Sequence, residues 1–92
     1  MEPHRDFGRT ADRLRRSALQ GFAPARGSLG LLHLAGVGVP EDRVEACAWL
    51  LLASAEGERD AVGLEADLRR ELSDGELAKA RELARRYGGK PL

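Results

Sequence analysis

Aromatic side chains, cysteine and net charge are all scarce in this sequence. Aromatic residues make up 4% of the 92 residues and charged residues 33%, while alanine and leucine supply most of the apolar content. This composition disfavours a β-sandwich, which draws on aromatic and β-branched residues, and it favours helices. The length suits a single domain with one modest core. We therefore expect an all-α fold.

Cys47 is the only cysteine, which excludes an intramolecular disulfide and favours a reducing compartment. Lys plus Arg and Asp plus Glu both number 15, so no net field attracts nucleic acid or an anionic membrane. The charged N-terminal segment has no apolar region of the signal-peptide type, and the longest apolar run, residues 46–55, is about half a membrane-spanning length. A soluble, cytoplasmic chain without membrane contact is expected.

Apolar periodicity and helix-end signals predict about five helices, over about residues 9–20, 24–35, 43–55, 59–72 and 74–87. Residues 1–8 are expected to be a mobile N-terminus and residues 88–92 a flexible tail. The Ser73 and Glu76 pair forms a capping box before the last helix, and Asp42 with Glu45 resembles one before the third.

The third predicted helix is apolar or small nearly all round, which is typical of a helix buried on most sides. Trp49 is expected to be its largest packing side chain, in preference to an exposed binding anchor, with its indole N–H paired at the core boundary. Gly30, in the middle of the second helix, predicts close approach of a neighbouring helix.

A glycine-valine turn over residues 36–40 separates these two helices. The two glycines permit positive φ, and Pro40 prevents a continuous helix. A phosphate-binding loop is excluded because the turn follows a helix and because Glu41 stands where such a motif needs glycine. A weak internal offset of 36 residues relates Gly21 to Gly57 and Ala25 to Ala61, which is a period typical of helical repeats.

The stretch 25–57 resembles one unit of the Sel-one-like repeat family, which is related to the tetratricopeptide repeats. The spacing is kept without a gap, and eleven positions match the family pattern: Ala25, Leu29, Gly30, Gly36, Gly38, Val39, Asp42, Ala46, Trp49, Ala53 and Gly57. The sequence departs from the pattern at His33, where the family prefers tyrosine, and at Ser54, where it prefers alanine.

The resemblance implies a short α/α solenoid of about five antiparallel helices in one domain, residues 1–92. One complete repeat over 25–60 would be flanked by half repeats, with 61–87 forming a half repeat plus a C-terminal capping helix. The implied function is a protein-protein interaction scaffold or adaptor. Because a short array leaves its ends uncovered, self-association or a constitutive protein partner is expected.

Arg26, Leu31 and Leu34 lie off the predicted buried stripe of the second helix and are the candidate partner-binding residues. The alternative is that both leucines pack inside the helix pairs. Two other functions stay open: a regulatory subunit or small hydrolase-like member of the family, and a nucleic-acid binder. The latter would use the basic side chains of the first helix: Arg9, Arg13, Arg15 and Arg16.

No catalytic residue, cofactor site or metal site is predicted, and we expect the chain not to be an enzyme. The sequence lacks H-x-x-x-H, C-x-x-C and H-E-x-x-H motifs. His33 is interpreted as a partly buried packing residue that hydrogen-bonds across the helix pair. Cys47 is interpreted as a buried, inert thiol in preference to a nucleophile.

Overall fold

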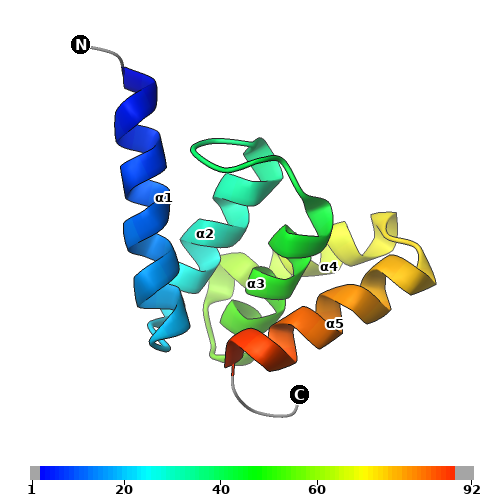
Figure 1. Cartoon of the computed structure of the whole chain (residues 1–92). Coiled ribbons are helices and arrows are strands. Elements are labelled where there is room, and N and C mark those ends of the chain that lie inside the picture. Colours follow the sequence, from blue (N-terminus) through cyan, green and yellow to red (C-terminus); the bar gives the residue numbers. More distant parts are fainter. Residues whose placement is uncertain (1–2, 89–92) are drawn as a thin grey trace.

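The computed structural model describes residues 3–88, and five helices account for most of them (Figure 1). The helices are α1 (Pro3–Leu19), α2 (Ala23–Ala35), α3 (Arg43–Ala55), α4 (Arg59–Glu71) and α5 (Asp74–Gly88). No strand occurs within residues 3–88, so the all-α prediction is confirmed. The arrangement is that of a short helical repeat.

Four of the five helices begin and end close to where the sequence predicts, whereas α1 begins earlier than expected. It starts at Pro3 rather than near Arg9, and so includes part of the N-terminal stretch 1–8 that we expected to be mobile. Proline is favoured at the first position of a helix, where its missing N–H costs nothing. Residues 1–2 and 89–92, to which the remaining predictions of mobile ends apply, lie outside the described range.

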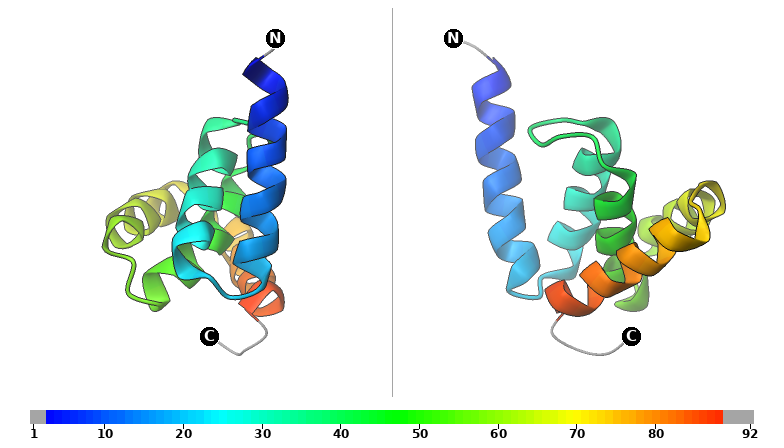
Figure 2. Two further views of the ribbon diagram at one scale, coloured as in Figure 1. Left: turned by 90° about the vertical axis from the view of Figure 1, so that its left-hand side faces the viewer. Right: turned by 45° about the vertical axis from the view of Figure 1, so that its right-hand side comes forward.

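Helix α3 lies at the centre, with α2, α4 and α5 packed on it, while α1 packs on α2 (Figures 1 and 2). All five consecutive residues from Ala46 to Leu50 are fully buried. Trp49 and Leu50 are among the largest of the fully buried side chains. The prediction that this helix is buried on most sides is therefore confirmed, as is the placement of Trp49 in the core.

Two clusters of buried side chains flank α3. The first joins α3 to α1, α2 and α5: Ala18, Ala25, Leu29, Ala48, Trp49, Leu52 and Ala84. The second joins α3 to α4 and α5: Ala46, Cys47, Leu50, Ala53, Ala61, Leu68 and Ala80. Since about half of these residues are alanine, the helices can approach α3 closely, and the few large side chains fill the remaining space.

Gly30 marks the closest approach of α2 to α3. A Cβ atom added to Gly30 would lie 2.9 Å from Leu50 Cγ and 3.3 Å from the carbonyl oxygen of Ala46. The first of these distances is shorter than carbon atoms tolerate without displacement. The close approach predicted from this glycine is therefore confirmed.

The turn between α2 and α3 depends on glycine in two ways. Gly36 and Gly38 adopt positive φ angles of 71° and 74°, which side chains with a Cβ atom rarely adopt. In addition, a Cβ atom on Gly38 would collide with the backbone carbonyl of Phe7 in α1. The turn thus lies directly against the backbone of α1.

Asp42 caps α3, but the expected capping box is only half formed. The Oδ1 atom of Asp42 accepts hydrogen bonds from the backbone N–H groups of Val44 and Glu45, both at 3.0 Å. The reciprocal bond is absent among the described residues: Asp42 N–H donates to the carbonyl of His33 at 2.9 Å. Glu45 accepts instead from Tyr87. At α5, by contrast, Ser73 and Glu76 form both bonds of the predicted capping box.

The joint between α1 and α2 recurs, 36 residues later, between α3 and α4. Gly21 and Gly57 have φ angles of 98° and 90°. The next residues, Phe22 and Glu58, adopt nearly the same backbone conformation, with φ and ψ of −77° and 106° against −72° and 106°. Three backbone hydrogen bonds also recur at equivalent positions. At the first joint, the N–H groups of Gly21, Phe22 and Ala25 donate to the carbonyls of Ala18, Ser17 and Phe22. At the second joint, the N–H groups of Gly57, Glu58 and Ala61 donate to the carbonyls of Ser54, Ala53 and Glu58. The α1–α2 and α3–α4 joints therefore have the same local backbone geometry.

Replacing Gly30 by alanine should destabilise the fold, although alanine favours helix formation. Overpacking against Leu50 is expected to lower the free energy of unfolding by about 1–3 kcal/mol, more than the helix-propensity gain of about 0.5–1 kcal/mol. Gly63→Ala in α4 is the matched control, because no heavy atom lies within 4 Å of its Cβ position. That variant should be more stable by about 0.5–1 kcal/mol. Urea denaturation measures both, and equal stabilisation by the two alanines would contradict the close approach.

Candidate functional site

A groove between α2 and α4 is the candidate binding site. Its volume is about 250 Å³, and its floor is formed by Leu50 of α3. The wall from α2 comprises Pro24, Gly27, Ser28 and Leu31, and the opposite wall comprises Glu58, Asp60, Ala61 and Leu64. Leu31 is 44% exposed, which is high for a leucine at a helix centre. The groove therefore combines apolar surface with two acidic side chains.

The three predicted partner-binding residues have different environments. Leu31 lines the groove. Leu34 is only partly exposed and packs against the second core cluster, as the alternative interpretation expected for both leucines. Arg26, expected on the exposed side of the helix, is buried, with 5% of its surface accessible. Its predicted exposure is therefore wrong.

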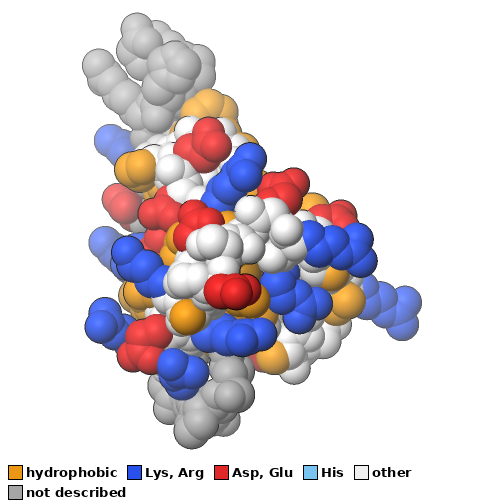
Figure 3. All heavy atoms as spheres, turned by 90° about the vertical axis from the view of Figure 1, so that its right-hand side faces the viewer, with side chains coloured by type: hydrophobic (Ala, Val, Ile, Leu, Met, Phe, Trp, Pro, Cys, Tyr) orange, Lys and Arg blue, Asp and Glu red, His pale blue; other side chains and the backbone are white. Residues whose placement is uncertain are grey.

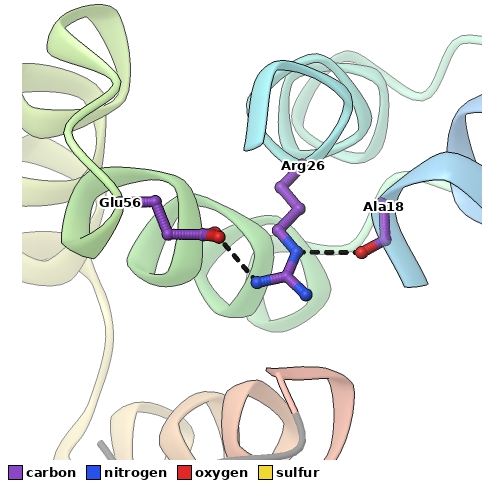
Figure 4. Close-up of polar contacts among 3 residues, drawn as sticks. All are labelled: Ala18, Arg26 and Glu56. Atoms are coloured by element: carbon purple, nitrogen blue, oxygen red, sulfur yellow. Dashed lines mark hydrogen bonds and ion pairs between the residues drawn. The ribbon is translucent and has the colours of Figure 1, made fainter. Parts of the chain in front are cut away.

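Arg26 is buried because its guanidinium group joins three helices (Figure 4). Its Nε atom donates to the carbonyl oxygen of Ala18 near the end of α1, at 2.8 Å. Its Nη1 atom forms an ion pair with Glu56 Oε1 at the end of α3, also at 2.8 Å. Such charge-assisted hydrogen bonds can offset the cost of burying a guanidinium group. Arg26 thus connects α1, α2 and α3 within the protein.

Trp49 is stacked on Tyr87 of α5, with ring centroids 4.3 Å apart and planes inclined by 2°. The expected hydrogen bond of its indole N–H is not found: Nε1 is buried and has no partner among the described residues. Tyr87 O–H lies 2.7 Å from both carboxylate oxygens of Glu45. The guanidinium carbon of Arg15 lies 5.9 Å from the centre of the Tyr87 ring. Side chains of α1, α3 and α5 therefore meet at Tyr87.

Burial raises the pKa of Tyr87 to about 12, and the neighbouring Glu45 carboxylate contributes to the same shift. Both effects oppose ionisation of the phenol, because a phenolate would be poorly solvated and would lie beside a second negative charge. The phenol therefore stays protonated and able to donate to Glu45 up to strongly alkaline pH.

His33 and Cys47 do not have the features of a nucleophile and its base. Burial, followed by the influence of the Glu65 carboxylate, raises the pKa of the Cys47 thiol to about 11, so the thiolate is scarce at neutral pH. His33 is buried, and its Nδ1 lies 3.2 Å from the carbonyl oxygen of Pro40. That contact is to the turn after α2, and not across the helix pair as expected. The thiol is consequently a packing group in this structure.

All four arginines considered for nucleic-acid binding are exposed on α1: Arg9, Arg13, Arg15 and Arg16. Among the described residues none of the four forms an ion pair. Arg15 also approaches the ring of Tyr87. Figure 3 shows the side of the molecule opposite α1, where basic and acidic side chains are interspersed.

Residues 3–88 contain no group of three or more histidine, cysteine, aspartate and glutamate side chains arranged to hold a metal ion. None of the helices in the described part of the chain is both long and apolar enough to cross a lipid bilayer.

The residues that carry the family resemblance have definable structural positions. Those that are buried are Ala25, Leu29, Gly30, Ala46, Trp49 and Ala53. Those in turns are Gly36, Gly38, Val39 and Gly57, and Asp42 is the cap of α3. No known family model matches the chain, and no curated protein matches it.

Neither the acidic wall of the groove nor the contact between Tyr87 and Glu45 is evident from the sequence. The α4 residues of the acidic wall are far along the chain from the α2 residues that face them, and Tyr87 is far from Glu45. No rule of sequence spacing relates the residues in either case. The recurrence at 36 residues offered a signal for the groove, because it implies that α2 and α4 are equivalent helices of neighbouring units.

Ultraviolet titration of the single tyrosine tests the environment of Tyr87 directly. In the native protein, tyrosinate absorbance should develop with a pKa near 12, and in the urea-unfolded chain near 10. Because the folded-state pKa is the higher one, the stabilisation from the neutral phenol is complete below about pH 10 and is lost as the pH rises towards 12.

Tyr87→Phe should remove this contribution from the pH dependence of stability and lower the free energy of unfolding at neutral pH by about 1 kcal/mol. Denaturation of both proteins at several pH values measures the difference. Native titration near pH 10 would contradict both the burial of Tyr87 and its contact with Glu45.

Proposed function

We propose that this chain is a protein-interaction module of the Sel-one-like repeat type, in which the groove between α2 and α4 receives a segment of a partner protein. The observation that carries the proposal is the exposure of Leu31 beside Leu64, above the buried Leu50. Exposed apolar surface of this kind, surrounded by polar side chains, is typical of protein contact sites.

Two further observations support assignment to the repeat family. The joint geometry recurs after 36 residues in two successive helix pairs, as a helical repeat requires. The glycines in the family pattern also occupy positions where the backbone or a neighbouring helix requires glycine, as Gly30 and Gly38 illustrate. A cytoplasmic location and the absence of enzymatic activity, both expected from the sequence, belong to the same proposal.

The other functions considered have less support from the structure. A small hydrolase would need an activated nucleophile, and the Cys47 thiol is buried and has a raised pKa. A nucleic-acid binder would need a continuous basic surface, and Arg15, one of the four candidate arginines, lies over the ring of Tyr87. The groove is the feature that favours protein binding over both.

The proposal predicts that partner binding depends on Leu31. Leu31→Ser should weaken binding by about tenfold or more, which corresponds to about 1.4 kcal/mol. The reason is that Leu31, exposed in the free chain, would be buried against the partner in the complex, and serine cannot make this apolar contact. Val62→Ser is the matched control, since Val62 is exposed to a similar degree, 49%, on α4. Affinity purification from the native cell with the three proteins, followed by titration of the recovered partner, measures the effect.

Both serine variants should retain the wild-type circular dichroism spectrum. A second copy of this chain is one candidate partner, and light scattering on the purified proteins detects it. Equal recovery of the partner by wild type and Leu31→Ser would contradict the proposed groove. Failure of the wild-type chain to bind any protein, its own copies included, would contradict the proposed function.

Leu34→Ser is expected to behave differently, because Leu34 packs against the core. It should lower the free energy of unfolding by about 2 kcal/mol. This variant therefore separates loss of binding from loss of folding.

A further inference from the structure

The charged side chains that line the α2–α4 groove are all acidic. Glu58 and Asp60 are the only charged residues among those that line it. Neither forms an ion pair with any described residue. In contrast, Glu56, two residues before Glu58, is paired with Arg26. The groove therefore presents two uncompensated carboxylates beside an apolar surface.

The fold does not itself require carboxylates at these positions. Glu58 is the residue that precedes α4, but its side chain makes no capping hydrogen bond. In the first unit the equivalent residues, 36 positions earlier, are Phe22 and Pro24. Phe22 and Glu58 share the same backbone conformation, so an apolar residue supports this joint equally well. Acidic residues at a helix start do interact favourably with the helix dipole, by about 0.3–1 kcal/mol.

The dimensions of the groove indicate the size of its occupant. A volume of about 250 Å³ is below the range of about 300–1,000 Å³ typical of sites that enclose a small molecule. It suits one or two side chains of a peptide. Leu31, Leu50 and Leu64 would contact an aliphatic side chain, and Glu58 and Asp60 would attract a cation next to it.

We propose that the groove binds a short segment of a partner protein in which a lysine or arginine lies close to a leucine, isoleucine or methionine. The aliphatic side chain lies over Leu50, between Leu31 and Leu64, and the cationic group lies against Glu58 and Asp60. This inference rests on the proposed function and adds the chemical nature of the partner.

Selection from a random peptide library on the intact chain tests the inference. Peptides enriched by the wild-type protein should carry a basic residue within a few positions of an aliphatic one. The affinity of a synthetic peptide of the selected sequence should fall by about tenfold in a Glu58→Gln, Asp60→Asn double variant. Its affinity for the wild-type protein should also fall with rising salt, and this dependence should be weaker in the double variant.

A double variant with Asp12→Asn and Glu41→Gln also removes two carboxylates, both outside the groove, and should bind the peptide as the wild type does. Circular dichroism and thermal unfolding verify that all variants are folded. Leu31→Ser should lower the affinity for the same peptide, and this loss would show that the peptide binds in the groove.

The outcomes separate the inference from the proposed function. Selected peptides that depend on Leu31 but lack a basic residue, or that bind the Glu58→Gln, Asp60→Asn variant unchanged, overturn the inference and leave the groove as a protein-binding site. Peptides that bind independently of Leu31 contradict both. Absence of any enriched peptide overturns the inference, because a short segment is then not the ligand, while partner binding is measured separately with the whole protein.

Discussion

Burial of α3 is the constraint on which the rest of this structure depends. A helix with no solvent-exposed side chain from Ala46 to Leu50 must be covered on several sides, and α2, α4 and α5 provide the cover. Full burial of a leucine such as Leu50 contributes about 1.5–3 kcal/mol, and a tryptophan buries still more surface. Small residues in α3 and Gly30 in α2 allow the neighbouring backbones to approach. The core is therefore one helix with partners on several sides, and not a layer shared equally among five.

Polar contacts then fix the positions of the helices around this core. Arg26 holds the end of α1 through the Ala18 carbonyl and the end of α3 through Glu56. At the other end of α3, Tyr87 of α5 is bonded to Glu45 and stacked on Trp49. The turn at Gly38 contacts the backbone of α1. The positions of the outer helices α1 and α5 therefore depend on side chains of α2 and α3. Several of the residues that meet in these contacts are far apart in the chain.

Several features of this fold could be predicted from the sequence. The capping bonds of Asp42 and Ser73 depend on neighbouring residues alone. The close approach at Gly30 and the burial of Trp49 are tertiary features, but a glycine in mid-helix and a helix apolar nearly all round indicate them. The start of α1 at Pro3 was missed, since apolar periodicity begins only at Phe7.

The features that define the candidate site could be predicted only in part, because they depend on tertiary packing. Helical periodicity placed both Leu31 and Arg26 off the buried stripe, but only Leu31 is exposed. Arg26 is buried because Glu56 and the Ala18 carbonyl, which no local pattern links to it, lie within reach. Likewise, Glu58 and Asp60 are read from the sequence as ordinary helix-start acids. Only the packing of α2 and α4 on α3 brings them to the same groove as Leu31.

Helix α3 forms the core that α2, α4 and α5 share, so its amides should be the best protected in the protein. Native-state hydrogen exchange measures this most directly, since it gives the opening free energy of each amide. Amides from Cys47 to Ala53 should exchange only through global unfolding, while those of α1 and α4 should exchange through openings of lower free energy. Exchange of the α3 amides at lower free energy than those of α1 and α4 would contradict this prediction.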